Sequence, residues 1–231
     1  HYLFKLLIMR KIYLLLWLLC VLTPLRAQSF VRTDSGIKTS MQSLNLEIQF
    51  FTPQIVRVYR TPDNTNPFKE SLSVTKKPES VNLNITQDDN VVVLASDKIK
   101  VSVHLITGKV SFFDSANTPL FTEKDFGAQF TPVYDVRKAT FSVRQAYMLD
   151  KDEAIYGLGQ HQDGKMNQRN QKIYLRQSNM NVCIPLIVST KGYGVFWDNY
   201  SPTTYADNPQ EMSFDSEIGD NSDYYFMYGG T

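Results

Sequence analysis

The chain has 231 residues, of which 42% are hydrophobic and 20% charged, so it can bury a sizeable core and is not expected to be disordered. Its formal net charge is +1 and no basic stripe is interleaved with aromatic residues, which excludes nucleic acid as an expected partner. The 13 tyrosines and 14 phenylalanines favour a β-rich fold, because aromatic side chains pack well on a pleated surface.

The first 27 residues are expected to precede the folded domain. Residues 1–8 come before the first methionine and are interpreted as spurious upstream translation. Residues 9–27 begin with a methionine and two basic residues, continue through a short apolar run and end at Ala27, which is the pattern of a secretory signal peptide. The alternative is a membrane anchor, which we disfavour because the apolar run of residues 12–22 is shorter than the roughly 20 residues that a span requires. An exported protein without a stable membrane span is therefore expected.

The two cysteines indicate neither a disulfide framework nor a zinc site. Cys20 lies within the signal-like segment and follows Leu19, whereas a cysteine that accepts lipid usually follows a small residue, so lipidation is disfavoured. Cys183 is then alone in the mature chain, which excludes an internal disulfide and the spacing of a four-ligand zinc site. We expect it to be a small buried apolar residue.

Alternation of apolar and polar residues dominates residues 28–231, which we predict to be one all-β domain. In residues 44–50 and 99–105 every second residue is apolar, as in a strand with one buried face. Turn signals at Thr107–Gly108 and Lys191–Gly192 predict two hairpins. Strands without crossover helices favour a large antiparallel β-sandwich.

Two long polar turns are predicted within this domain, at residues 61–70 and 215–223. The sequence ends on Tyr228 and two glycines directly after an apolar strand, so we expect the protein to continue beyond Thr231.

No residue pattern predicts a catalytic centre in this chain. Hydrolysis of a glycoside needs two carboxylates flanking the sugar, but Asp150, Asp152, Glu153 and the pair Asp88–Asp89 are expected to be solvated turn residues. The G-x-S-x-G and H-E-x-x-H motifs are absent, as is a phosphate-binding glycine loop. We therefore expect no catalytic residue, no metal and no cofactor. Trp197 is expected either to stack on a sugar or to lie in the core.

The segment "YGLGQHQDGKMNQRNQ" (residues 156–171) differs from its surroundings, because a loop rich in amides follows two glycines. Glycine tolerates positive φ and close backbone approach, so Gly157 and Gly159 are expected to let a strand end turn sharply. The amide side chains are then expected to satisfy backbone groups near the end of that strand.

From residue 155 to 200 the sequence resembles the N-terminal domain of glycoside hydrolase family 31, and among its members it is most similar to bacterial α-xylosidases of the Bacteroides type. The stretch at Tyr156–Gln160 is similar to the family's "YGLGE" pattern, and the stretch from Ser189 to Asn199 is similar to its "S-x-K-G-Y-G-x-x-W-D-N" pattern. Residues 55–63 resemble an early strand of the family more loosely.

The resemblance implies a galactose-mutarotase-like β-sandwich, truncated here before a (β/α)8 barrel that carries the catalytic aspartates of a retaining α-glycosidase. It implies that this chain is non-catalytic, packs on its own C-terminal barrel and lends the loop Leu175–Asn181 to the substrate pocket. Arg176, Gln177 and Asn179 are the expected contacts to an oligosaccharide with a terminal α-linked sugar. Gln160 and His161 are expected to pack between the domains.

Several implications concern the whole protein. The substrate is expected to be an α-xyloside or α-glucoside from plant or dietary oligosaccharides. Family α-glucosidases tend to carry an aspartate where this sequence has Gln177, which leaves the sugar open. The periplasm or outer surface of a Gram-negative bacterium is the expected location. Residues 28–231 alone are expected to be poorly soluble, because the face that packs on the barrel would be exposed.

Two other functions stay open on the sequence. A stand-alone carbohydrate-binding module would present a flat row of exposed aromatic residues. An aldose-1-epimerase-like enzyme would need a pair of histidines with a carboxylate base, and His104 and His161 are the only pair in the mature chain. Neither histidine lies in a matching motif.

Overall fold

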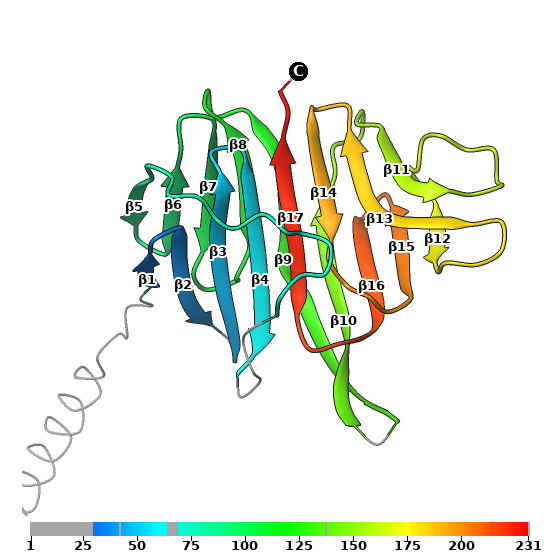
Figure 1. Ribbon diagram of the computed structural model, residues 1–231. Helices are drawn as coiled ribbons and strands as arrows, with labels where there is room; N and C mark the ends of the chain where they lie inside the picture. The colour runs from blue at the N-terminus through cyan, green and yellow to red at the C-terminus, as the bar shows by residue number, and fades with distance from the viewer. Residues whose placement is uncertain (1–29, 42, 64–68, 137, 231) are drawn as a thin grey trace, which may run out of the picture.

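The computed structural model describes residues 30–41, 43–63, 69–136 and 138–230. The predicted upstream segment (1–8) and signal peptide (9–27) lie outside these described residues. The described residues form two packed antiparallel sheets, so the prediction of a large antiparallel β-sandwich is confirmed (Figure 1). Within the same residues, no helix has the length and hydropathy needed to cross a membrane.

The first sheet faces the viewer in Figure 1 and has eight strands. In spatial order they are β1 (Phe30–Thr33), β2 (Gly36–Met41), β3 (Leu44–Thr52), β4 (Ile55–Pro62), β17 (Ser222–Tyr228), β14 (Tyr193–Trp197), β13 (Val182–Ser189) and β11 (Ile155–Gln160). The last strand in sequence, β17, therefore lies in the middle of the sheet, where it pairs with β4 on one side and β14 on the other.

The second sheet lies behind the first and has nine strands. In spatial order they are β12 (Lys172–Leu175), β15 (Thr203–Asn208), β16 (Glu211–Gly219), β10 (Lys138–Met148), β9 (Pro119–Asp135), β8 (Val110–Asp114), β7 (Ile99–His104), β6 (Val91–Ala95) and β5 (Asn84–Asp88).

Period-two alternation explains these strands. In β7 the apolar residues Ile99, Val101 and Val103 are buried and alternate with partly exposed polar residues. The hairpin predicted at Thr107–Gly108 joins β7 to β8, and the one predicted at Lys191–Gly192 joins β13 to β14. Both hairpin predictions are confirmed.

The long polar turn predicted at residues 215–223 is wrong. Residues 215–219 continue β16, and β17 already begins at Ser222. The polar side chains in this region are paired across strands: the buried Asp223 carboxylate receives two hydrogen bonds from Arg57, of 2.8 and 2.7 Å. A charge neutralised by a neighbouring strand can occupy a strand position that sequence polarity assigns to a loop.

Aromatic side chains fill much of the space between the sheets. Phe112 of β8 stacks on Phe226 of β17, with ring centroids 4.1 Å apart. Phe121 of β9 lies 4.7 Å from the ring of Tyr147 and 5.1 Å from that of Tyr193. One ion pair joins the sheets through this core, because Arg60 of β4 binds Glu123 of β9 at 2.6 Å, and both side chains are buried.

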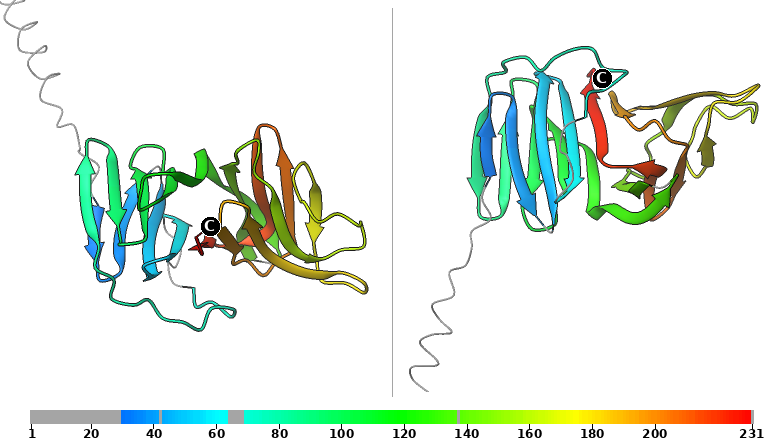
Figure 2. Two further views of the ribbon diagram at one scale, coloured as in Figure 1. Left: turned by 90° about the horizontal axis from the view of Figure 1, so that it is seen from above. Right: turned by 60° about the horizontal axis from the view of Figure 1, so that its bottom comes forward.

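Residues 69–83, which contain no regular strand, belong to the connection from β4 to β5. This segment passes over the outside of the first sheet (Figures 1 and 2). It is attached along its length: Arg57 donates to the carbonyl of Lys69, the amide of Leu72 donates to the hydroxyl of Tyr200, and the amide of Glu79 donates to the carbonyl of Phe51. The turn predicted at residues 61–70 lies partly in β4 and partly outside the described residues.

Candidate functional site

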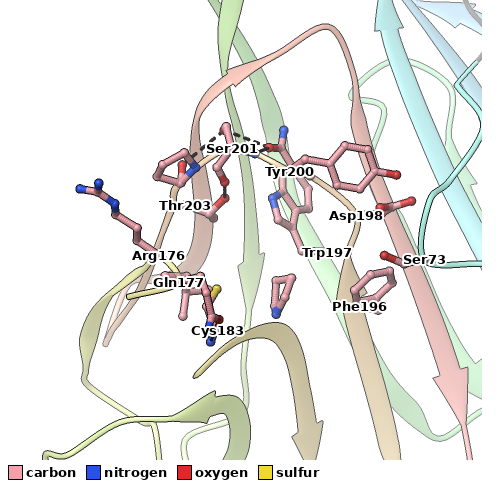
Figure 3. Close-up of a pocket in the computed structure, with 14 residues that line it drawn as sticks. Ser73, Arg176, Gln177, Cys183, Phe196, Trp197, Asp198, Tyr200, Ser201 and Thr203 are labelled. Carbon is pink, nitrogen blue, oxygen red and sulfur yellow. Dashed lines mark hydrogen bonds between the residues drawn. The ribbon is translucent and has the colours of Figure 1, made fainter. Parts of the chain in front are cut away.

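A pocket of about 380 Å³ lies between the end of β12, the start of β13 and the end of β14 (Figure 3). Three stretches of chain form its wall: the end of β12, the start of β13, and the end of β14 with the connection to β15. Ser73 of the segment 69–83 closes one side. The lining residues are Ser73, Leu175, Arg176, Gln177, Cys183, Pro185, Phe196, Trp197, Asp198, Asn199, Tyr200, Ser201, Pro202 and Thr203.

A β-bulge in the pairing of β11 with β13 lies beside this pocket, where one residue of β11 faces three residues of β13. Gly157, Leu158 and Gly159 have φ values of +113°, +68° and +92°, and the register with β13 shifts between the two glycines. The bulge turns the Leu158 side chain fully into the core. A Cβ atom on Gly159 would lie 1.9 Å from the carbonyl oxygen of Val182, so only glycine fits there. The expected positive φ of both glycines is confirmed.

We expect Gly159→Ala to destabilise the protein more than Gly164→Ala. Both glycines have positive φ, but a Cβ on Gly164 meets nothing within 4 Å, whereas one on Gly159 meets the backbone of β13. Backbone strain alone costs about 1–3 kcal/mol. The comparison of urea midpoints therefore separates strain, present in both variants, from the clash, present in one. Equal losses of stability in the two variants would show that the β13 backbone moves away from the new Cβ atom at little cost.

The amide-rich loop after β11 is held down by Arg169, a residue that the sequence analysis missed. Its guanidinium donates to the Asp207 carboxylate at 2.8 Å and to the carbonyls of Asp150 and Glu153 at 2.6 and 2.5 Å. Asn167 accepts a hydrogen bond from the amide of Ile155 at the start of β11. The loop thus satisfies backbone groups before and at the start of β11, whereas the sequence predicted groups near the end of that strand. The sequence did not reveal this role of Arg169, because the groups that accept its hydrogen bonds lie 16 to 38 residues away in the chain.

The predicted interdomain residues lie next to this loop and do not line the pocket. The ring of His161 is within 2.8 Å of the carbonyl oxygen of Leu158, which fixes it against the bulge. The side chain of Gln160, the last residue of β11, is exposed.

Two of the three predicted sugar contacts line the pocket, and the third does not. Arg176 and Gln177 form part of its wall, whereas Asn179 lies in the turn closed by the bridge between Ser178 and Asn181. The Gln177 side-chain oxygen accepts a hydrogen bond from the amide of Cys183 at 3.0 Å. Its amide nitrogen is then the group that can donate to a ligand.

The pocket also contains Asp198, which the sequence analysis did not single out. This residue is 1% exposed, and neither carboxylate oxygen has a hydrogen-bond partner among the described residues. Lys69 lies 3.5 Å from one of these oxygens and also donates to the Asp198 carbonyl. In the sequence Asp198 belongs to the "W-D-N" element, but that pattern does not indicate that its side chain is buried.

Two other side chains of the wall resolve open expectations. Trp197 is fully buried, stacks on Phe214 with centroids 5.7 Å apart and donates its indole N–H to Ser216, so it belongs to the core. Cys183 is half-buried rather than fully buried. Burial raises the pKa of its thiol, which keeps it protonated and poorly nucleophilic.

The carboxylates predicted to be solvated do not all behave alike. Glu153 is buried, so this expectation is wrong for it: its carboxylate accepts hydrogen bonds from Ser189, Tyr193 and the amide of Asp150. Asp152 is exposed, and its side chain faces solvent. Asp198 is the only carboxylate among the residues that line this pocket.

Comparison with known proteins gives consistent relationships. A family model described as the glycosyl hydrolase 31 N-terminal galactose mutarotase-like domain matches residues 45–206. The alpha-xylosidase of Saccharolobus solfataricus is 29% identical over 197 residues, which cover 81% of this chain and 26% of that enzyme. Alpha-glucosidase 2 of Bacillus thermoamyloliquefaciens is 25% identical over 204 residues, which cover 80% of this chain and 24% of that relative. This chain thus spans about a quarter of the length of these curated relatives.

Solved structures show the same fold. A family 31 alpha-xylosidase from a soil metagenome, complexed with xylose, superposes with a TM-score of 0.77 at 19% identity, over 87% of this chain and 32% of that one. The family 31 alpha-xylosidase from Xanthomonas citri is 30% identical, with a TM-score of 0.68 over 78% of this chain and 19% of that one.

Proposed function

Because the chain belongs to glycosyl hydrolase family 31 through its N-terminal galactose mutarotase-like domain, we propose that it is the non-catalytic sandwich of an exported retaining α-glycosidase. The family match over residues 45–206 is the observation that carries this proposal. The curated relatives named as an alpha-xylosidase and an alpha-glucosidase support an α-linked xylose or glucose as the sugar released. The signal-like pattern of residues 9–27 supports export. The proposed location is the periplasm or outer surface of a Gram-negative bacterium.

An apolar patch on the outer face of the first sheet supports packing against a catalytic barrel of the same protein. Val182, Ile184 and Val188 of β13 are 43%, 47% and 46% exposed, and Tyr156 of β11 lies directly opposite Val188. Exposed apolar residues gathered on one sheet face indicate a surface that is covered in the working protein. The relatives supply enough additional chain to cover it, since three quarters of their length lies outside the match.

The loop Leu175–Asn181 leaves β12 next to this patch and leads into β13. If the barrel covers β13, this loop and the pocket wall both lie at the mouth of the barrel. Arg176, Gln177 and Asn179 are then the residues proposed to contact the oligosaccharide. Arg176 and the amide nitrogen of Gln177 provide hydrogen-bond donors, which suit sugar hydroxyls.

The two rival functions find less support in the geometry. The exposed tyrosines lie on four different elements, so no strand presents a row of them; they are Tyr134 on β9, Tyr156 on β11, Tyr174 on β12 and Tyr200 in the connection after β14. His104 is the last residue of β7, the third strand from the β5 edge of the second sheet. His161 follows β11, which is the edge strand of the first sheet. The histidine pair of an epimerase-like centre is therefore not assembled.

The proposal is tested with the protein expressed from its complete coding sequence. We expect it to hydrolyse an aryl α-xyloside or α-glucoside and to leave the corresponding β-anomers intact. Ile184→Lys should lower the rate at least about tenfold, because a lysine ammonium would be buried without a partner at the domain contact. Val31→Lys is the matched control, since Val31 is 67% exposed on β1 at the opposite edge of the same sheet. Absence of α-glycoside hydrolysis would refute the proposed function, and equal rates for both variants would refute the docking face.

A further inference from the structure

We propose that one face of the hairpin formed by β9 and β10 is a docking surface for a later segment of the same chain, which follows Thr231. This hairpin arm comprises residues 128–135 and 138–145, and its tip projects from the sandwich at the bottom of Figure 1. The inference rests on the proposed function, because that function supplies the additional chain. It assigns a second contact to that chain, on the other sheet from the apolar patch of β13.

The hairpin arm has one apolar face and one mostly polar face. Three pairs of residues that lie directly opposite each other form the apolar face: Phe130 with Val143, Pro132 with Phe141, and Tyr134 with Ala139. The residues between them point to the other side and, apart from Val133, are polar; they are Gln129, Thr131, Val133, Asp135, Lys138, Thr140, Ser142 and Arg144. Val143 is buried in the core, and Phe130 and Phe141 pack against it, so the apolar face continues the core-facing side of the second sheet.

The outer part of this apolar face is uncovered among the described residues. Tyr134 is 74% exposed, and Pro132 and Ala139 are exposed as well. Val136, at the tip of the hairpin arm, is 89% exposed. A two-stranded hairpin is only marginally stable in water unless one of its faces is covered. Exposed apolar side chains on such a hairpin therefore indicate a partner.

The partner is expected on this face and not along the free edge of β9. Where the structure describes the chain, β8 pairs with β9 only from Pro119 to Thr122, so the later part of β9 has β10 as its one neighbouring strand. Pro132 has no N–H group to donate to an added strand. The pairing of β9 with β10 is also irregular between Glu123 and Ala128. Prolines and bulges are features that keep an edge from accepting another strand.

The size of the apolar face favours a tethered partner over a second copy of the chain. Six residues on each of two strands cover about 20 Å by 10 Å, which corresponds to a few hundred Å². A stable complex between separate molecules buries about 800 Å² on each partner. A later segment of the same chain needs no such area, because its tether holds it at an effective concentration on the order of millimolar.

The chain that follows β17 can return to the hairpin arm. Lys138 and Thr140 bind the Asp220 carboxylate at 2.9 and 2.8 Å, so the hairpin arm lies beside the start of β17. β17 then runs to Tyr228, at the opposite end of the sandwich in Figure 1. A strand of this length spans about 23 Å, which about 15 residues of helix can cover in the reverse direction. This is a small part of the three quarters of the relatives' length that lies outside the match.

The test is thiol labelling of the full-length protein. Ala139→Cys places a thiol on the apolar face, and Thr131→Cys places one on the polar face of the same hairpin arm; both positions are exposed among the described residues. The labelling of the parent protein is subtracted, and each rate is divided by the rate of the same variant in unfolding urea. We expect Ala139→Cys to react at least about tenfold more slowly than Thr131→Cys, because the docked segment shields it.

A second pair of variants gives an independent measurement. Tyr134→Lys is expected to lower the thermal midpoint of the full-length protein by about 2 °C or more, because it places an unpaired ammonium group in the contact. Thr131→Lys makes the matching change on the polar face and should leave the midpoint unchanged.

The outcomes separate this inference from the proposed function. Equal labelling rates for the two cysteine variants would overturn it, and so would an unchanged midpoint for Tyr134→Lys. Protection of Ala139→Cys that disappears on dilution would assign the face to a second copy and would overturn it too. Neither measurement depends on turnover. Loss of α-glycoside hydrolysis would therefore refute the proposed function and leave the docking surface in place.

Discussion

Replacing Glu123 by alanine is expected to lower the free energy of unfolding by about 3–5 kcal/mol, the range for breaking a buried ion pair from one side. The Glu123 carboxylate receives two hydrogen bonds from Arg60, of 2.8 and 2.6 Å, and one each from the amide of Val110 and the hydroxyl of Tyr224. Its removal leaves the guanidinium of Arg60, which is 3% exposed, without its countercharge in the core. The two sheets also lose a polar link between β4 and β9.

Urea unfolding followed by tyrosine fluorescence measures this loss. Glu70→Ala serves as the control, since Glu70 is exposed and its nearest cation is 3.6 Å away at the surface. A double variant, Arg60→Met with Glu123→Leu, should recover most of the stability, because replacing both charges with apolar groups leaves none unpaired. If Glu123→Ala unfolds at the same urea concentration as Glu70→Ala, the prediction is wrong, and the guanidinium of Arg60 must be hydrated when Glu123 is removed.

Replacing Trp197 by alanine is expected to cost about 3–5 kcal/mol, as for other large aromatic residues removed from a core. The indole ring is fully buried, lies parallel to Phe214 with an interplanar angle of 5° and donates to Ser216 at 2.9 Å. Alanine would leave a cavity where β14 packs on β16, between the two sheets.

Thermal unfolding of Trp197→Ala and of Tyr174→Ala compares a buried with an exposed aromatic residue, since Tyr174 is 48% exposed. We expect a large fall in midpoint for the first variant and almost none for the second. The comparison thereby tests the core role that the burial of Trp197 assigns to it. Equal midpoints for the two variants would contradict that role.

The alternation of apolar residues was sufficient to predict the sandwich and two of its hairpins, because burial of one sheet face is a local property of the sequence. It failed where polar residues are buried, as in Asp223 and Glu153. The partner of Asp223 is Arg57, 166 residues away in sequence, and those of Glu153 include Ser189, 36 residues away. Pairings between distant strands depend on sheet order, which local pattern does not contain.

The candidate site was predicted in part for the same reason. Family resemblance pointed to the stretch that contains Arg176 and Gln177, and both residues line the pocket. Asp198 gave no signal, because its importance comes from burial beside Lys69, a residue of the segment that crosses outside the first sheet. Only the assembled fold brings these two elements together.

The central position of β17 sets an order for folding during synthesis. Strand β4 keeps an unpaired edge until residues 222–228 have been made, since β17 is its partner on that side. The ribosome needs on the order of 10–30 s to add the intervening residues, at typical rates of elongation. Through that interval the nascent chain carries an open, apolar strand edge, the feature that chaperones shield and that promotes association between chains. The first sheet can therefore be completed only after β17 has emerged, however early its other strands begin to pair.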